Sequence, residues 1–192
     1  NKNLYRKQIK AKELWERIIN TQIETGLPYI LYKDTVNRKS NQKNYGIIKS
    51  SNLCTEIMEY SDSNETAVCN LASICLPKFI TEPTDLYPRG NVDYELLHEK
   101  TKEVVINLNC IINVNCYPTP ESRLSNMRHR PVGIGVQGLA DLFMILKISY
   151  DSEEARNINR KIFECIYYAS LEQSMEISKK VGPYESFEGS PA

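Results

Sequence analysis

The sequence has no excess of charge of either sign. Lys plus Arg and Asp plus Glu number 24 each in 192 residues, so the formal net charge is zero. Nucleic acids and anionic membranes attract basic surfaces, and this balance favours neither as the main partner. With 41% hydrophobic and 25% charged residues, the composition is typical of a globular chain with one core and excludes a disordered one.

Long apolar runs are missing as well. No stretch approaches the ~18 residues that a membrane helix needs, and residues 1–4 do not have the basic-then-apolar layout of a secretion signal. We therefore expect a cytoplasmic protein without a membrane partner. There is no initiator methionine, and residues 188–192 resemble the middle of a loop, so we also expect a split or excised segment of a longer polypeptide.

Cysteine and histidine are too few, and wrongly spaced, for two further classes of protein. Six cysteines are sparse for the disulfide framework of a secreted domain of this size. They include no C-x-x-C pair, and His98 and His129 have no partner at ligand spacing, so no zinc site is predicted. Each histidine is interpreted as a surface or packing residue.

Apolar periodicity predicts alternating helices and strands. Four helices are expected at residues 8–24, 93–113, 139–146 and 152–181. Four strands are expected at residues 28–32, 56–60, 67–76 and 131–136. Loops are expected at residues 37–44, at residues 61–64, and after residue 113, where Pro118 and Pro120 interrupt the chain. This alternation predicts an α/β fold with a mainly parallel sheet.

One glycine pattern points to a different function. Residues 133–138, GIGVQG, fit the G-x-G-x-x-G pattern of dinucleotide-binding loops. In such loops a hydrophobic strand precedes the first glycine, whereas here residues 128–131 read RHRP. The glycines would therefore lie inside the strand, and we favour close strand packing as their role.

Three chemically suggestive side chains alternate along residues 51–56. In an extended segment, Asn52, Cys54 and Glu56 would project from the same side. An amide can orient hydroxyl groups, a cysteine can act as a nucleophile or radical carrier, and a carboxylate can act as a base. A cysteine in a half-polar strand is more often a small packing residue. The spacing alone leaves both interpretations open.

A family resemblance favours the chemical interpretation. Residues 51–57, SNLCTEI, and residues 67–73, AVCNLAS, closely resemble the active-site stretch of the large subunit of eukaryotic and viral class I ribonucleotide reductases. Further ordered blocks extend the resemblance almost end to end: 22–26, 28–29, 31–34, 37–42, 128–131, 133–141, 182–185 and 188–191.

The resemblance implies a fold. Members of this family form a ten-stranded α/β barrel from two parallel five-stranded halves, with the cysteine at the tip of a finger loop threaded into the barrel. Residues 1–192 would form the middle part of this catalytic barrel domain, with the finger at about residues 46–58. The N-terminal regulatory domain and the C-terminal part of the barrel would lie outside the segment, so we expect it to be inactive alone.

The resemblance also implies residue roles. Cys54 would be the thiyl radical that removes the 3′ hydrogen of a ribonucleoside diphosphate, Glu56 the base for the 3′-hydroxyl, and Asn52 the group that holds the ribose hydroxyls. Cys69 would be one thiol of the redox-active disulfide, with its partner outside this chain. The substrate-binding residues would be Ser51, Asn52, Leu53, Cys54, Thr55 and Glu56. The remaining cysteines are interpreted as packing residues.

Partners follow from the same resemblance. The radical would come from a separate small subunit with a metal-tyrosyl centre, so no metal or cofactor is expected on this segment. The large subunit would form a homodimer, with ATP and deoxynucleotide effectors bound elsewhere, and thioredoxin or glutaredoxin would reduce the disulfide. A second interpretation remains open, namely a degenerate paralogue that retains the fold as an interaction module without chemistry.

Overall fold

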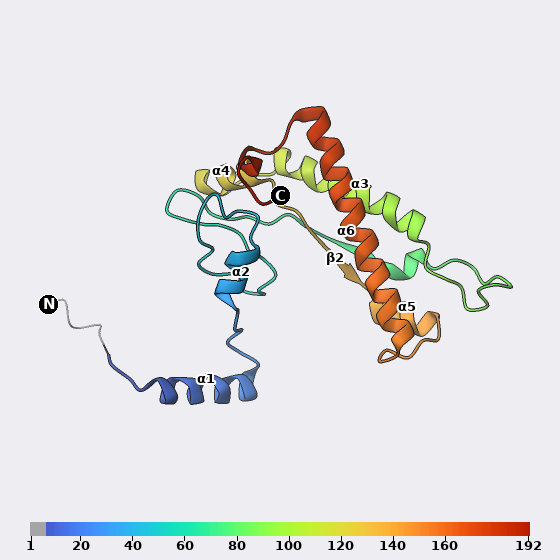
Figure 1. Cartoon of the computed structure of the whole chain (residues 1–192), viewed down its shortest axis with the longest axis horizontal. Helices are drawn as coiled ribbons and strands as arrows, with labels where there is room; N and C mark the ends of the chain where they lie inside the picture. The colour runs from blue at the N-terminus through green and yellow to red at the C-terminus, as the bar shows by residue number, and fades with distance from the viewer. Residues whose placement is uncertain (1–6) are drawn as a thin grey trace.

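The computed structural model describes residues 7–192; residues 1–4, where no secretion signal was recognised, lie outside this part. The elements in chain order are α1 (Ala11–Thr25), α2 (Lys33–Lys39), β1 (Leu71–Cys75), the 3₁₀ helix η1 (Leu76–Phe79), α3 (Tyr94–Val114), α4 (Pro120–His129), β2 (Gly133–Gln137), α5 (Leu139–Ile145), α6 (Glu153–Val181) and the 3₁₀ helix η2 (Glu185–Phe187) (Figure 1).

The strands β1 and β2 form a parallel pair. Leu71 lies opposite Gly133 and Cys75 lies opposite Gln137, with the register unbroken between them. Parallel neighbours need a long crossover connection, and here η1, α3 and α4 supply it. The predicted parallel pairing and the strands expected at residues 67–76 and 131–136 are confirmed, although β1 is shorter than its prediction.

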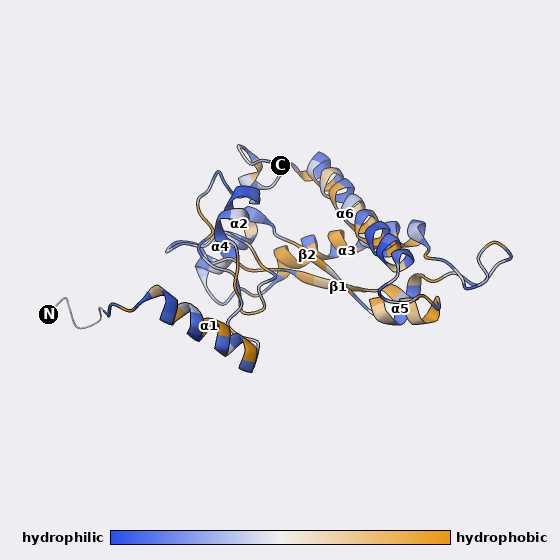
Figure 2. Cartoon of the chain, turned by 60° about the horizontal axis from the view of Figure 1, so that its bottom comes forward, coloured by the Kyte–Doolittle hydropathy of each residue, from blue (hydrophilic) through white to orange (hydrophobic). Residues whose placement is uncertain are grey.

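The core lies where the sheet meets α3, α5 and α6. Leu76, Leu97, Leu142 and Ile162 come from four different elements and are fully buried. They belong to a single cluster of apolar side chains that also includes Ile74 of β1. Figure 2 shows the apolar residues along β1, β2 and α5, beside the paired helices α3 and α6. The helix α3 thus packs against β1 and against the second long helix, α6.

The long helices follow local signals. The Asp93 side chain accepts a hydrogen bond from the Leu96 amide at 2.9 Å and caps α3. Ser152 caps α6 in the same way, through the Ala155 amide at 3.1 Å. The helix α6 ends at Gly182, whose φ of 86° ordinary residues avoid. The predicted helices at residues 8–24, 93–113, 139–146 and 152–181 are confirmed to within a few residues.

The helix α4 corrects the expected loop around Pro118 and Pro120. Pro120 is the first residue of α4, where its missing N–H removes no helical hydrogen bond. Thr119 accepts a hydrogen bond from the Ser122 amide at 3.2 Å, and the Ser122 side chain accepts one from the Thr119 amide in return. This reciprocal capping starts a helix where proline alone indicated an interruption.

Two predicted strands are wrong. Residues 28–32 are exposed and residues 56–60 are half-buried or exposed, and neither segment pairs with a strand in the described part of the chain. A β-like sequence forms a strand only when a partner accepts its backbone hydrogen bonds. The loop expected at residues 37–44 is also partly helical, because α2 runs to Lys39 before turns begin.

The glycine pattern at residues 133–138 serves packing. Gly133 and Gly135 lie inside β2. A Cβ added at Gly133 would lie 2.6 Å from the Leu71 side chain, and one at Gly138 would lie 2.7 Å from the Pro77 ring. The preference for close strand packing over dinucleotide binding is confirmed.

Among residues 7–192, no helix combines the length and apolar character needed to cross a membrane.

We expect residues 1–192 to associate when purified alone. A two-stranded sheet leaves backbone edges unpaired, and large apolar side chains such as Trp15 of α1 and Tyr167 of α6 are exposed. Sedimentation should show species larger than a monomer, and unfolding should lack one sharp transition. A soluble monomer with cooperative two-state unfolding would contradict this expectation and show an autonomous domain.

Candidate active site on the finger loop

The finger loop, residues 46–58, is held at its base by side-chain amides. Asn37 of α2 accepts a hydrogen bond from the Ile48 amide at 2.7 Å and donates one to the Ile48 carbonyl at 3.0 Å. Ile48 is itself buried. Gln42 accepts a hydrogen bond from the Tyr60 amide at 2.8 Å, on the segment that returns from the tip of the loop. Within residues 7–192, neither side of the finger pairs with a strand, and these side-chain amides supply hydrogen bonds to its backbone instead (Figure 1).

A glycine is required where the finger begins. A Cβ added at Gly46 would lie 2.6 Å from the Tyr60 ring. The ring therefore packs directly on the backbone of residue 46, and Tyr60 also donates a hydrogen bond to Asp62 at 3.1 Å. Asp62 in turn accepts hydrogen bonds from the Asn64 and Glu65 amides and forms the turn expected at residues 61–64.

The tip of the finger is a turn, which corrects the expected extended geometry. The Thr55 amide donates to the Asn52 carbonyl at 3.2 Å, and Thr55 has a φ of 67°. Simple alternation of side chains does not apply across such a turn. Cys54 thus lies within the turn, and Asn52 and Glu56 lie on either side of it in the sequence.

The turn still brings Asn52 and Glu56 together. The Asn52 side-chain amide donates to Glu56 Oε1 at 2.7 Å, and its carbonyl oxygen accepts from the Ile57 amide at 3.1 Å. Ser51 closes the neck of the turn by donating to the Ile57 carbonyl at 2.7 Å. The amide and the carboxylate predicted to act together are therefore joined by a hydrogen bond on either side of Cys54.

The tip points away from the rest of the described chain. Leu53 is 87% exposed, and Cys54 is also exposed. Within residues 7–192, no hydrogen bond links the Cys54 thiol to Asn52 or Glu56. The side chains of Leu53 and Cys54 are therefore accessible to a ligand or to another protein segment.

Cys69 lies near the carboxylates of the finger. It is half-buried just before β1, and burial raises the pKa of its thiol. The negative charges of Glu59 and then Glu56 raise this pKa further, whereas the local backbone lowers it. The carboxylates of Glu59 and Glu56 thus disfavour the thiolate form of Cys69.

A buried amide network fixes the backbone next to Cys69. Asn70 donates to the side chain of Asn126 in α4 at 2.8 Å and to the Pro131 carbonyl at 2.8 Å. The Asn70 carbonyl accepts from the Gly133 amide at 2.8 Å, at the start of β2. Both asparagines are buried, so loss of either partner would leave a polar group unsatisfied.

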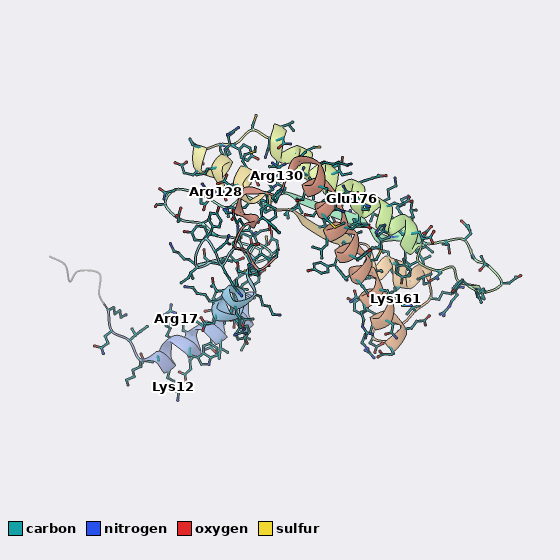
Figure 3. All side chains as sticks on the ribbon, turned by 45° about the horizontal axis from the view of Figure 1, so that its top comes forward. Lys12, Arg17, Arg128, Arg130, Lys161 and Glu176 are labelled. Carbon is teal, nitrogen blue, oxygen red and sulfur yellow. The ribbon has the colours of Figure 1, made fainter. Side chains whose placement is uncertain are left out.

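An ion-pair cluster attaches the segment after the finger to α4 and η2. Glu65 is buried, and its Oε2 lies 3.1 Å from both Arg128 Nη1 and His129 Nε2. His129 Nδ1 lies 2.8 Å from Ser186 Oγ. Burial lowers the pKa of His129, and Glu65 opposes this change. Figure 3 shows Arg128 at the end of α4. His129 was expected to be a surface or packing residue, and it is a buried residue whose two ring nitrogens pair with Glu65 and Ser186.

Sequence reasoning assigned no role to Asn37, Gln42, Asn70 or Glu59. Asn37 and Gln42 lie in a polar stretch that the sequence analysis interprets as a loop. The one relevant signal is that a side-chain amide can both donate and accept hydrogen bonds, as anchoring a backbone segment requires. Asn70 follows Cys69 directly. Its burial was not visible in the sequence, because its partner Asn126 is 56 residues away.

All six cysteines are free within the described part of the chain. The partner of Cys69 outside this chain stays a prediction. In residues 7–192, no group of three or more His, Cys, Asp or Glu side chains is placed to hold a metal ion.

Comparisons with known proteins agree with one another. The family described as "Ribonucleotide reductase, barrel domain" matches residues 1–192. The ribonucleoside-diphosphate reductase large subunit of Caenorhabditis elegans is 58% identical over 186 residues, which cover 97% of this chain and 23% of that protein. The large subunit of Variola virus is 55% identical over 188 residues, which cover 98% of this chain and 24% of that protein.

A solved structure is similar as well. The class Id ribonucleotide reductase alpha subunit of Actinobacillus ureae aligns with a TM-score of 0.74 at 28% identity, covering 93% of this chain and 34% of that one. The chain spans about a quarter of the length of the curated relatives named above. The predicted fold class and family resemblance are confirmed: the chain belongs to the ribonucleotide reductase barrel-domain family.

Proposed function

We propose that this chain supplies the reaction centre of a ribonucleoside-diphosphate reductase large subunit. The observation that carries the proposal is the turn at residues 52–55, which presents Cys54 while an Asn52–Glu56 hydrogen bond of 2.7 Å holds the amide and the carboxylate beside it. The proposal is supported by membership of the barrel-domain family and by large-subunit relatives of 58% and 55% identity.

Each side chain has a defined part in the proposed reaction. Cys54 as a thiyl radical takes the 3′ hydrogen of the bound ribonucleoside diphosphate. Glu56 takes the 3′-hydroxyl proton while the 2′-hydroxyl leaves as water, and Asn52 orients the ribose hydroxyls by hydrogen bonds. Ser51, Leu53 and Thr55 complete the substrate-contacting loop.

Cys69 supplies reducing equivalents in this proposal. Loss of the 2′-hydroxyl requires two electrons and two protons, and a dithiol provides both as it becomes a disulfide. Cys69 and a cysteine outside this chain form that dithiol, and thioredoxin or glutaredoxin restores it. The radical reaches Cys54 from a separate small subunit, and the large subunit acts as a homodimer in the cytoplasm.

The test is reconstitution with the partner subunit. The full-length subunit that contains this segment is combined with its small subunit, thioredoxin and a ribonucleoside diphosphate, and deoxynucleotide is measured. Product formation supports the proposal. A complex that binds the nucleotide but forms no deoxynucleotide would favour the interaction module instead.

Glu56→Gln should lower turnover of this full-length enzyme by about 10²-fold or more, because the amide cannot accept the 3′-hydroxyl proton. Nucleotide binding, measured by equilibrium dialysis, should change little, since the amide retains the shape and the contact with Asn52. The matched control is Glu82→Gln, an exposed carboxylate in the loop after η1. Turnover by Glu56→Gln equal to that of the control would exclude the base role.

A further inference from the structure

His129, the last residue of α4, is a buried histidine without a part in the reaction described above. Its Nε2 atom lies 3.1 Å from Glu65 Oε2, and its Nδ1 atom lies 2.8 Å from the Oγ atom of Ser186 in η2, which lies beside α4 (Figure 1). An ionised carboxylate only accepts hydrogen bonds, so we assign the hydrogen to Nε2, and Nδ1 accepts from the Ser186 hydroxyl. Burial lowers the pKa of His129 and favours this neutral ring. Both ring nitrogens are therefore paired, which fixes the orientation of the ring.

The same ring contacts the chain on both sides of the finger. Tyr45 is the residue directly before the finger, and its ring meets that of His129 edge to face, with 5.0 Å between the ring centres. Glu65 follows the finger and closes the turn that starts at Asp62, because its carbonyl accepts from the Asp62 amide at 2.9 Å. Arg128 supports both contacts, since it pairs with Glu65 at 3.1 Å and its guanidinium lies 5.6 Å from the centre of the Tyr45 ring. The C-terminal end of α4 therefore holds both sides of the finger base.

The helix α4 also holds the segment that carries Cys69. Asn70 follows Cys69 directly, and its side chain exchanges hydrogen bonds of 2.8 and 3.3 Å with the buried side chain of Asn126 in α4. Asn126 and His129 are three positions apart, so they lie on one face of the helix. One face of α4 thus contacts the base of the finger through His129 and the neighbour of the predicted redox thiol through Asn126.

We propose that His129 is a positioning residue that sets where the finger lies relative to Cys69. It acts through Glu65 and Tyr45 and touches no reacting atom. This inference rests on the proposed function, in which Cys54 on the finger and Cys69 act on the same nucleotide. Reacting groups must be held close to their productive geometry, and a displacement of about 1 Å can cost about 10²-fold in rate. Loss of one of the two anchors on α4 would leave both thiols intact but change their relative position.

The experiment separates the first turnover from the later reduction of the disulfide. The full-length subunit is reduced, freed of reductant and mixed with its small subunit and a saturating ribonucleoside diphosphate. The rate at which the first equivalent of deoxynucleotide forms is measured. Dithiothreitol is then added, and the appearance of protein thiols is followed. Nucleotide binding is measured separately by equilibrium dialysis, and thermal unfolding shows whether each variant is folded.

Three substitutions divide the contacts of His129. Phenylalanine retains a ring against Tyr45 but loses both hydrogen bonds. Glutamine can still donate from its side-chain amide to Glu65, whereas the shorter asparagine can pair only with Ser186. The control is His98→Phe, the same change at the other histidine of the chain, which lies on α3 with its Nε2 atom 2.9 Å from a glutamate of α6.

His129→Phe should slow the first turnover at least about tenfold, because the finger loses its hydrogen-bonded link to α4. Nucleotide binding and the rate of disulfide reduction should change little, since Asn126 still holds the segment of Cys69. His129→Gln should recover part of the first-turnover rate and should be faster than His129→Asn. His98→Phe should match wild type in every measurement.

A first turnover of His129→Phe equal to that of wild type would overturn the proposal. Equal losses in first turnover, nucleotide binding and disulfide reduction would also reject it, because they would show a general structural role. If His129→Phe does not fold, the other two variants decide, and a glutamine variant no faster than the asparagine variant rejects the proposal. These results, obtained with a wild type that forms deoxynucleotide, leave the proposed function intact. A wild type that forms none rejects the proposed function together with this inference.

Discussion

Cys54→Ser in the full-length enzyme is expected to abolish deoxynucleotide formation while nucleotide binding persists. Serine retains the size and the turn geometry of residue 54, but its O–H bond is much stronger than an S–H bond. A side-chain radical would therefore not form at this position. Product per enzyme should be measured with the small subunit present, and nucleotide binding should be measured by equilibrium dialysis.

The control for this prediction is Cys110→Ser, because Cys110 is also exposed and lies on α3 away from the finger. This variant should retain wild-type turnover. The radical role would be refuted if Cys54→Ser turned over within about tenfold of the wild-type rate. A tenfold difference corresponds to about 1.4 kcal/mol in the activation free energy. Absence of product from wild type as well would favour the interaction module.

Cys69→Ser is expected to stop repeated turnover that depends on thioredoxin. Without this thiol the active-site disulfide does not form, so no external dithiol can supply the next pair of electrons. Deoxynucleotide per enzyme should be measured over time with thioredoxin and its reductase in excess. Wild type should produce many equivalents, and the variant should produce fewer than one.

Cys165→Ser is the matched control, because Cys165 is also half-buried and its pKa is also raised by burial. Its thiol donates to the Tyr94 carbonyl at 3.4 Å in the contact between α6 and α3, far from the finger in the sequence. Its serine variant should continue to turn over. Unimpaired cycling by Cys69→Ser would show that Cys69 is a packing residue.

The tip of the finger has a geometry that the sequence did not predict, and the roles of its residues stay predictions. Asn52 and Glu56 do lie together, yet the reason is a turn with Thr55 at positive φ and not the alternation of a strand. A turn and a short extended run have similar local composition here. The turn is closed by hydrogen bonds within residues 51–57, whereas Asn37 and Gln42 anchor the base of the finger at Ile48 and Tyr60.

The sequence by itself determined α1, α3, α5 and α6, because their signals are local. Apolar spacing, the caps at Asp93 and Ser152, and the stop at Gly182 all act within a few residues of the elements that they define. The sequence also determined the family, since ordered blocks from residue 22 to residue 191 match it.

Only the tertiary structure decided which β-like runs become strands and which titratable groups interact. Residues 71–75 form β1 because β2 accepts their backbone hydrogen bonds, whereas residues 56–60 have no such partner in the described chain. The burial of Glu59 and of Cys69 is not visible in the sequence. Burial raises the pKa of both side chains, and the charge of Glu59 raises that of Cys69 further; these effects depend on how the chain packs in three dimensions.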